Sequence, residues 1–290
     1  MFKDNAVINL YKPVGITSHK AVKKVQDILK ARKAGHTGTL DPFAEGVLLV
    51  CLNRATRIAE YIEGLPKVYT VVMRLGISTD TYDMTGEVIS RGEAGDIGVE
   101  TVEKAMSAFQ GKIMQVPPMY SALKVGGVPL YKLARKGIEV ARKEREVTIE
   151  SIKLTEYNPP DVRMTVKCSK GTYIRSLVHD IGTALGPGAA VKELRRDAVG
   201  NFRYEDSETF DGIESGRFSV ITMDRAIGHL REISLDEERA RLVRHGVGFY
   251  HDGNRIQDGV LRLKDPSGEL LGIGRPRQNG FIRIEKVFVD

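Results

Sequence analysis

The segment GHTGTLDP, residues 35–42, constrains the fold most, because it suits neither a helix nor the interior of a strand. Gly35 and Gly38 reach positive φ at little cost, and Pro42 has no amide hydrogen to donate. Pro42 also favours an extended backbone at Asp41, the residue before it. The sequence therefore predicts a stiff corner that fixes one carboxylate. A reactive carboxylate and a plain Asp-Pro turn both fit this pattern.

On either side of this corner the chain mixes strand and helix patterns without a repeated βα unit. Ser18 should cap a helix that follows the first strand, and a Gly-Gly hairpin at 126–127 should precede a short helix. Strands are expected at 7–12, 46–52, 67–76, 146–157 and 162–169, and helices at 18–29, 58–62, 102–109 and 174–181. We therefore expect an α+β fold with a mainly antiparallel, mixed sheet.

The last part of the chain has a different texture and predicts a second domain. Ser234 and Glu237 have the spacing of a capping box for a helix that ends near His245. Strand patterns follow at 260–276, with a turn inside, and at 281–288. We expect one large domain over residues 1–225 and a small β-rich domain over residues 226–290.

The charge of the chain favours a polyanionic partner without proving one. The net charge is +6, and the first 34 residues contain eight Lys or Arg and only two Asp. A positive field beside the corner suits nucleic acid, although a solvated helix face gives the same pattern. No apolar run approaches the ~20 residues of a membrane span, and no secretory signal is visible. Cys51 and Cys168 lie far apart, which predicts reduced thiols in a cytoplasmic protein without a zinc site.

Several long motifs in order resemble one known family. They are KPVGITS, GHTGTLDPFAEGVLLV, KVYTVVMRLG, QVPPMYSALKVGGVPLYKLARKG and CSKGTYIRSLVHDIGTAL, within residues 6–200. Together they resemble the TruB-type tRNA pseudouridine synthases, and the C-terminal segment is similar to PUA-type RNA-binding domains. The resemblance implies isomerisation of uridine 55 in the T-loop of tRNA, with no metal or organic cofactor. The target base must then be flipped into a pocket.

The resemblance also assigns roles to three residues of the predicted site. Asp41 corresponds to the catalytic aspartate, which either attacks the nucleotide covalently or assists glycosidic cleavage and proton transfer. Arg175 matches the arginine that pairs with it, although an ordinary surface arginine is the alternative. Tyr69 matches the aromatic residue that stacks on the base, and an inward-facing strand tyrosine is the alternative.

The remaining expected site residues are supporting or RNA-contacting. His36 matches a histidine that contacts the RNA loop, Leu194 would line the base pocket or the core, and Lys12 would support the pocket or contact a phosphate. We expect RNA contacts from these basic residues: Lys20, Lys23, Lys24, Lys132, Arg135, Lys136, Arg195 and Arg196. Segment 124–145 coincides with the part of the family that closes over RNA. Ala190, in GPGAAV, departs from the family pattern, which often has His there.

Three functional readings fit the sequence. The first is a stand-alone, monomeric tRNA pseudouridine synthase that binds the T-arm and needs no protein partner. The second is a non-catalytic tRNA-binding or tRNA-folding protein, which needs the basic surface but not Asp41. The third is a guide-dependent synthase that acts on ribosomal RNA. The residues Asp41, Tyr69 and Arg175 together favour an enzyme, and the lack of long basic tails favours the stand-alone form.

Overall fold

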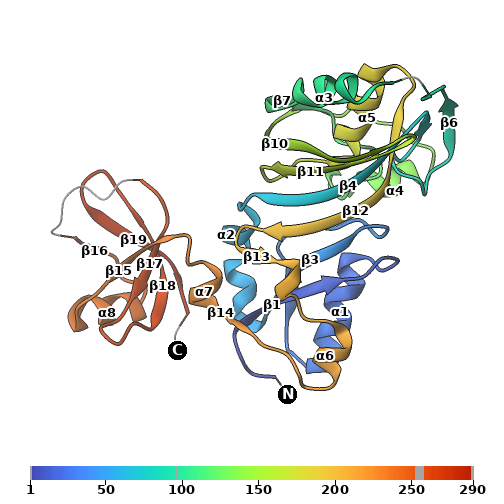
Figure 1. Ribbon diagram of the computed structural model, residues 1–290. Coiled ribbons are helices and arrows are strands. Elements are labelled where there is room, and N and C mark those ends of the chain that lie inside the picture. Colours follow the sequence, from blue (N-terminus) through green and yellow to red (C-terminus); the bar gives the residue numbers. More distant parts are fainter. Residues whose placement is uncertain (1, 96, 252–257, 289–290) are drawn as a thin grey trace.

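The structure, a computed structural model, describes residues 2–95, 97–251 and 258–288 of the chain and contains two sheets with separate cores (Figure 1). A large mixed sheet runs through the first part of the chain, and a five-stranded sheet forms the C-terminal part. In the described part of the chain, no helix is long and apolar enough to cross a membrane.

The large sheet has the order β14-β1-β3-β12-β4-β11-β10-β7, and β2 and β13 pair at its side. Its strands are β1 (Ala6–Lys12), β2 (Ala34–His36), β3 (Glu45–Leu52), β4 (Lys67–Leu75), β7 (Gly111–Gln115), β10 (Arg145–Asn158), β11 (Asp161–Cys168), β12 (Ala189–Val199), β13 (Phe202–Arg203) and β14 (Ile221–Thr222). Every neighbouring pair is antiparallel except β3 and β12, which are parallel. The expected α+β fold with a mainly antiparallel, mixed sheet is confirmed.

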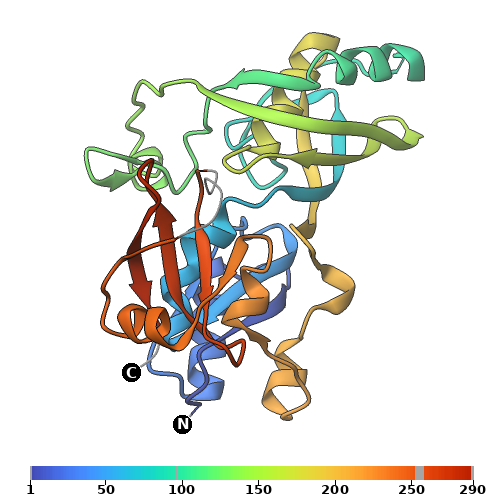
Figure 2. The same ribbon diagram turned by 90° about the vertical axis from the view of Figure 1, so that its left-hand side faces the viewer.

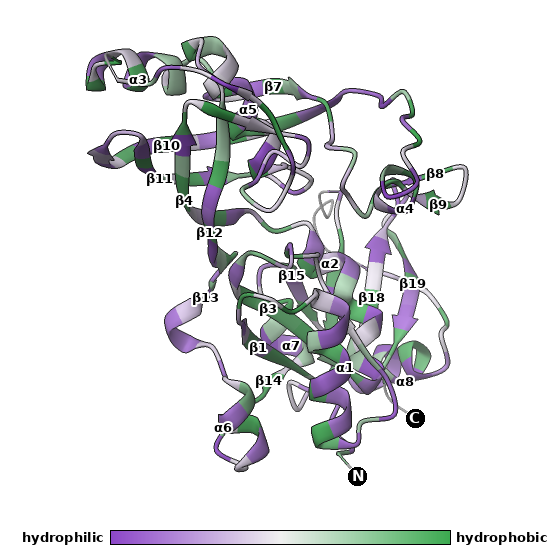
Figure 3. Cartoon of the chain, turned by 90° about the vertical axis from the view of Figure 1, so that its right-hand side faces the viewer, coloured by the Kyte–Doolittle hydropathy of each residue, from purple (hydrophilic) through white to green (hydrophobic). Residues whose placement is uncertain are grey.

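Helices cover both faces of this sheet. They are α1 (Ser18–Leu29), η1 (Asn53–Ile58), α2 (Ala59–Glu63), α3 (Val99–Ser107), α5 (Ile174–Leu185), η2 (Tyr204–Asp206), α6 (Phe210–Glu214) and α7 (Met223–Ala226). Figure 3 shows apolar residues running along β1 and β3. In β3, Val47 and Leu49 join one core and Leu48 and Val50 join another, so both faces of the strand are buried. This explains why β3 reads as a continuous apolar run.

The expected cap of α1 is wrong by one residue. Thr17 has the extended backbone of an N-cap, and its side chain accepts a hydrogen bond from the amide of Lys20. Ser18 is instead the first helical residue, and its buried hydroxyl bonds both to the amide and to the carbonyl of Leu40, each at 2.8 Å. The helix start therefore fixes the residue that precedes Asp41.

The parallel pairing of β3 with β12 joins the two halves of the large sheet, and the two backbones approach each other closely there. Only Glu45 and Gly46 of β3 pair with Arg195 and Arg196 of β12 in this ladder. Gly46 has φ +104, and a Cβ at this position would lie 2.3 Å from the carbonyl oxygen of Arg196. Only glycine fits there, because any side chain would meet backbone.

One loop and one long connection extend from the large sheet beside the first turn of α5. The loop contains β5 (Ile77–Thr79) and β6 (Val88–Arg91), with residues 80–87 between them. We call residues 116–144 the strap. The strap contains the expected Gly-Gly hairpin, with β8 (Lys124–Val125) and β9 (Val128–Pro129), and the short helix α4 (Leu130–Ala134).

The C-terminal sheet has the order β15-β17-β18-β19-β16 and packs against α8. Its elements are β15 (Arg231–Ser234), α8 (Glu237–Arg244), β16 (Phe249–Tyr250), β17 (Leu261–Lys264), β18 (Leu270–Pro276) and β19 (Phe281–Val287). The expected capping box is wrong, because Ser234 ends β15 and Asp236 caps α8 by accepting from the amide of Arg239 at 2.8 Å. The division after residue 225 falls inside α7 and stays a prediction.

The C-terminal sheet lies against the large domain through an apolar contact (Figure 2). Ile273 and Phe288 belong to the same buried cluster as Ile58 and Ile62 of η1 and α2. The guanidinium of Arg57 lies 5.6 Å from the centre of the Phe288 ring. The two parts of the chain therefore share a core.

Candidate active site

The corner predicted at residues 35–42 is present and is held from several directions. The amide of Gly15 donates to the Pro42 carbonyl at 2.7 Å, and the amide of Ala44 donates to the Asp41 carbonyl at 3.1 Å. Gly38 has φ +145, which a residue with a side chain rarely adopts. These bonds leave the Asp41 carboxylate projecting from a fixed backbone.

Arg175, near the start of α5, meets this carboxylate with two parallel hydrogen bonds. Its Nε donates to Oδ2 of Asp41 at 2.9 Å and its Nη2 donates to Oδ1 at 3.1 Å. The Arg175 side chain is 5% exposed and that of Asp41 is 31% exposed. A bidentate pair of this kind fixes the orientation of the carboxylate. The predicted partnership of Asp41 and Arg175 is thus present in the geometry, with one edge of the carboxylate open.

The remaining donors of Arg175 bind two separate segments. Nη1 donates to the Thr81 carbonyl at 2.8 Å, and Nη2 donates to the Tyr120 carbonyl of the strap at 2.7 Å. A second carboxylate also approaches, since Oδ2 of Asp83 lies 3.5 Å from Nη1. Arg175 therefore joins the corner, the 80–87 loop and the strap.

Asp83 is a functional-site residue that the sequence did not single out beyond a turn role. Its side chain is 4% exposed, and its Oδ1 accepts hydrogen bonds from the hydroxyl of Thr81 and from the amide and hydroxyl of Thr85. The carboxylate thus orders the loop and faces Arg175 at the same time. The TDTYD spacing was a usable signal, since a buried Asp needs donors of this kind.

Tyr69 and Leu194 lie together in the core next to the corner. Both belong to the buried cluster that also contains Leu40, and Tyr69 is 8% exposed. Burial raises the pKa of the Tyr69 hydroxyl, with the nearby guanidinium of Arg196 acting against this effect. The phenol therefore stays neutral, with an apolar ring beside the site. Leu194 is 6% exposed and packs as a core residue.

Lys12 is buried and cannot contact a phosphate in this conformation. Its side chain is fully enclosed, and Nζ donates to the carbonyls of Pro13 at 2.8 Å and Ile16 at 2.9 Å. Burial lowers the pKa of Lys12 to about 8, while the charge of Asp41 acts in the opposite direction. Of the two expected roles, the structure places Lys12 in the supporting one, where it holds the 13–16 turn beside the corner.

His36 lies on β2, at the start of the corner. The amide of Gly38 donates to its Nδ1 at 3.3 Å. Burial lowers the pKa of His36, and the charges of Arg196 and His19 lower it further. The ring is therefore neutral, and its expected contact with the RNA loop stays a prediction.

Arg196 is misassigned by the sequence as an RNA contact. The residue is 3% exposed, and its guanidinium donates to the carbonyls of Val47 at 2.7 Å, Gly38 at 3.2 Å and Thr39 at 3.3 Å. Arg196 therefore holds the backbone of the corner through the carbonyls of Gly38 and Thr39. Neighbouring arginines in sequence alternate between the faces of a strand, so one of the pair had to point inward.

The other basic residues remain at or near the surface, and several already have partners. Lys23 pairs with Asp27 at 2.5 Å, and Lys24 pairs with Glu214 at 3.1 Å. Arg195 donates to Asp197 at 2.6 Å, and its guanidinium lies 4.1 Å from the Tyr204 ring centre. The remaining predicted contacts are exposed: Lys20, Lys132, Arg135 and Lys136. Their contact with RNA stays a prediction. Ala190 is fully buried in β12 opposite Arg74, away from the surface.

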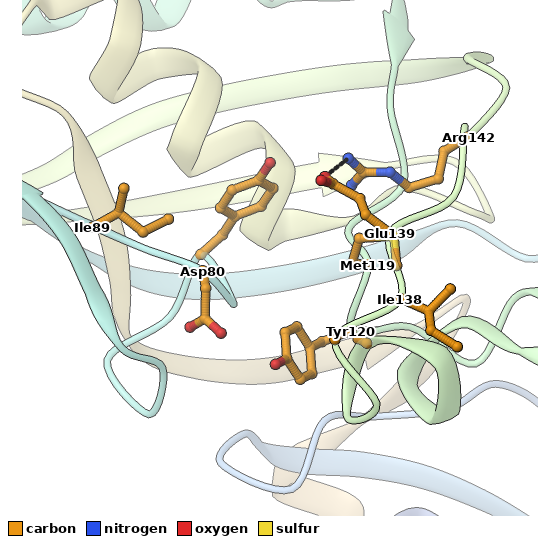
Figure 4. A pocket seen from close by; sticks show the side chains of 10 residues that line it. Asp80, Ile89, Met119, Tyr120, Ile138, Glu139 and Arg142 are labelled. Carbon is orange, nitrogen blue, oxygen red and sulfur yellow. Dashed lines mark ion pairs between the residues drawn. The ribbon is translucent and has the colours of Figure 1, made fainter.

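A cavity of about 250 Å³ opens between the strap and the 80–90 segment (Figure 4). Asp80 and Ile89 line one side, and Met119, Tyr120 and Ile138 line the other. Because the Tyr120 carbonyl also accepts from Arg175, this cavity adjoins the site. The Tyr120 hydroxyl has a raised pKa, from burial and from a hydrogen bond to Asp80.

Comparison with known sequences identifies the relatives of this chain. Residues 26–174 match the profile of the TruB family pseudouridylate synthase N-terminal domain. Residues 175–231 match that of the tRNA pseudouridylate synthase B C-terminal domain. A tRNA pseudouridine synthase B of Clostridium tetani is 42% identical over 98% of this chain and 100% of its own length. Its counterpart in Dehalococcoides mccartyi is 39% identical over 98% of this chain and 97% of its own length.

Solved structures agree with this assignment. The chain is similar to a protein in the crystal structure of a Cbf5-Nop10-Gar1 complex, with TM-score 0.77, 30% identity and coverage of 99% of this chain and 85% of the other. A chain in the structure of an H/ACA RNP bound to a substrate RNA has TM-score 0.76 and 29% identity, and covers 99% of this chain and 86% of its own. The chain belongs to the TruB family of pseudouridylate synthases.

Proposed function

We propose that this TruB-family chain isomerises uridine 55 in the T-loop of tRNA to pseudouridine, with Asp41 as the carboxylate that the reaction requires. The observation that carries the proposal is the bidentate pairing of a partly open Asp41 with the buried Arg175. The names of the curated relatives support tRNA as the substrate. A pure binding protein would have no use for a carboxylate held in this way.

The isomerisation breaks the bond from C1′ of ribose to N1 of uracil and forms a bond from C1′ to C5. The proton on C5 must leave, and N1 must gain one, so the net reaction consumes nothing. Asp41 either attacks the nucleotide or assists cleavage and proton transfer, and both roles need an ionised carboxylate. Arg175 orients the carboxylate, because its two hydrogen bonds hold both oxygen atoms of Asp41.

The side chains around Asp41 suit a uracil base that has been flipped out of the folded RNA loop. The apolar ring of Tyr69 and the Leu40 side chain lie in one cluster beneath the corner. Stacking on an aromatic ring contributes ~1–3 kcal/mol per base, which offsets the cost of extrusion. The exposed basic residues of α1 and the strap are placed to contact phosphates, and binding should weaken steeply with salt. We further propose that the enzyme acts alone, as a cytoplasmic monomer, with its C-terminal domain contacting RNA.

The test is pseudouridine formation in unmodified tRNA and in an isolated T-arm hairpin, with the modified position mapped. Wild type should modify position 55 of tRNA, and Asp41→Asn should give no product while its Kd for tRNA stays within about twofold. Asp206→Asn, an exposed residue far from the site in sequence, serves as the matched control and should keep full activity.

Two outcomes would change this conclusion. Full activity of Asp41→Asn would remove Asp41 from the reaction. Tight tRNA binding without product from wild type would favour a tRNA-folding protein or a guide-dependent synthase. The latter should be tested with a guide RNA, because one of the similar solved structures is an H/ACA RNP bound to a substrate RNA.

A further inference from the structure

Tyr82 has an unusual backbone for a bulky residue and lies between two groups that bind Arg175. Its φ is +62, a left-handed conformation that glycine adopts freely and tyrosine rarely does. Such a conformation persists only where the surroundings hold it, and held strain of this kind is concentrated at functional sites. Thr81, on one side of it, accepts from Arg175, and Asp83, on the other side, faces the same guanidinium.

The ring of Tyr82 is stacked on His179 of α5. The ring centres are 4.0 Å apart and the ring planes differ by 13°. His179 follows Arg175 by four residues, so both side chains lie on the same face of α5, one turn apart. The helix therefore binds the loop twice, through a guanidinium and through a stacked ring.

The contacts of both partners point to a held arrangement. The Tyr82 carbonyl accepts from the amide of Val191 at 3.0 Å, which fixes the backbone at the start of β12. Within the described residues, the Nδ1 atom of His179 is buried without a hydrogen-bond partner. Burial lowers the pKa of His179, so the ring is neutral. Since no polar bond of Nδ1 orients this ring, its stacking on Tyr82 does.

We propose that the Tyr82–His179 stack is a positioning device for the isomerisation, which aims the Thr81 carbonyl and the Asp83 carboxylate at Arg175 and so keeps Arg175 bidentate on Asp41. We assign neither aromatic ring a contact with the substrate. This inference rests on the proposed function of Asp41. It assigns to the stack an effect on the chemical step and none on tRNA affinity.

The experiment tests the effect of the Tyr82 ring separately from the effects of its backbone conformation and its hydroxyl. Tyr82→Gly keeps the left-handed conformation without strain but removes the ring, whereas Tyr82→Phe keeps the ring and removes the hydroxyl. On α5, His179→Leu removes the partner ring of the stack, whereas His179→Phe keeps an aromatic ring at that position. Tyr61→Phe, at a tyrosine of α2 whose ring lies near Lys286, is the control.

We expect Tyr82→Gly and His179→Leu each to lower the single-turnover rate of pseudouridine formation about tenfold, with the Kd for tRNA within about twofold. Both Phe variants and the control should match wild type. The double variant Tyr82→Gly/His179→Leu should lose no more than either single variant, because both remove one contact. Equal loss in Tyr82→Phe and Tyr82→Gly, or wild-type rates in both non-aromatic variants, would overturn the proposal.

A second readout does not depend on activity. The NMR signal of the Arg175 Nε–H, which donates to Asp41, should shift or broaden in the two non-aromatic variants and stay unchanged in the two Phe variants. An unchanged signal in all four variants would reject the positioning role even if the reaction itself proved to be different. If Tyr82→Gly fails to fold, the two His179 variants decide alone. Absence of product from wild type would instead count against the proposed function.

Discussion

At the scale of single residues, the site depends on the geometry of one guanidinium. Arg175 donates to Asp41 twice and to the carbonyls of Thr81 and Tyr120 once each. A lysine could not make this set of bonds, because its ammonium is a compact charge on a flexible stem. The buried arginine therefore fixes three chain segments in one place and orients the Asp41 carboxylate.

Another residue of α5 gives a pH-dependent prediction. Burial raises the pKa of Asp180 from its ordinary value of 3.8 to about 6. The folded state therefore binds this proton more tightly than the unfolded state, and stability falls as pH rises through that window. Asp180→Asn removes the cost of burying the charge, so it should stabilise the protein by about 1–2 kcal/mol near neutral pH, allowing for solvent screening.

The measurement is urea unfolding of wild type and Asp180→Asn at about pH 7.5 and again at about pH 4.5. The difference should shrink at the lower pH, where the folded carboxyl is protonated. Asp206→Asn, at an exposed position, should show no such trend. A difference that is equal at both pH values would contradict the assignment to Asp180.

The role of a site residue could be predicted from the sequence only where the residue belongs to a recognisable motif. Asp41 and Arg175 were paired by resemblance, and the structure brings them together across 134 residues of sequence. Tyr82 was missed because its contact with α5 has no local pattern, whereas Asp83 was missed although the TDTYD spacing marked it as a residue with local donors. Arg196 was misassigned because charge is visible in a sequence whereas burial of that charge is not.

At the scale of elements, the close approach of β3 to β12 at Gly46 leads to a specific prediction. Gly46→Ala would place a Cβ 2.3 Å from the Arg196 carbonyl oxygen at φ +104. Overpacking and an unfavourable φ should together cost about 3 kcal/mol or more. Since Arg196 also holds the corner, activity should fall as well.

Thermal or urea unfolding of Gly46→Ala checks this expectation. Gly64→Ala is the matched control, because its φ is −66 and the nearest atom to an added Cβ would be 3.8 Å away. The control should change stability by less than about 1 kcal/mol. Equal stability of the two variants would show that β12 shifts to make room.

Strand and helix positions were largely predictable, whereas helix starts were not. Alternation, a continuous apolar run and β-branched content located β1, β3, β4, β10 and β11 within one or two residues, whereas β12 was not predicted. The caps failed at Ser18 and at Ser234 with Glu237, where Thr17 and Asp236 take the role instead. Several polar residues stand near each start, and only the backbone conformation selects the one that caps.

At the scale of the whole molecule, the shared core of the two domains predicts cooperative unfolding. Phe288 is 7% exposed and belongs to the cluster that spans the junction. Phe288→Ala should remove about 3–5 kcal/mol of packing at that junction. We expect wild type to unfold in one calorimetric transition and the variant in two, because the C-terminal sheet loses its coupling to the large domain.

Phe218→Ala provides the comparison, since Phe218 packs inside the large domain beside α1. It should lower the transition temperature and keep a single transition. Two transitions in wild type would contradict the shared core. The chain order of the sheet was not predictable either, because the parallel contact of β3 with β12 joins residues 150 positions apart and leaves no periodic trace.

The shared core around Ile273 and Phe288 also bears on how a large RNA would bind. Under the proposed function, a tRNA held by its T-arm would present its remaining surface to a C-terminal domain that is already in place. A contact made there would be intramolecular, with a high effective concentration and no linker to order. Whole tRNA would then exceed the isolated T-arm in affinity by avidity, even where each C-terminal contact is weak by itself.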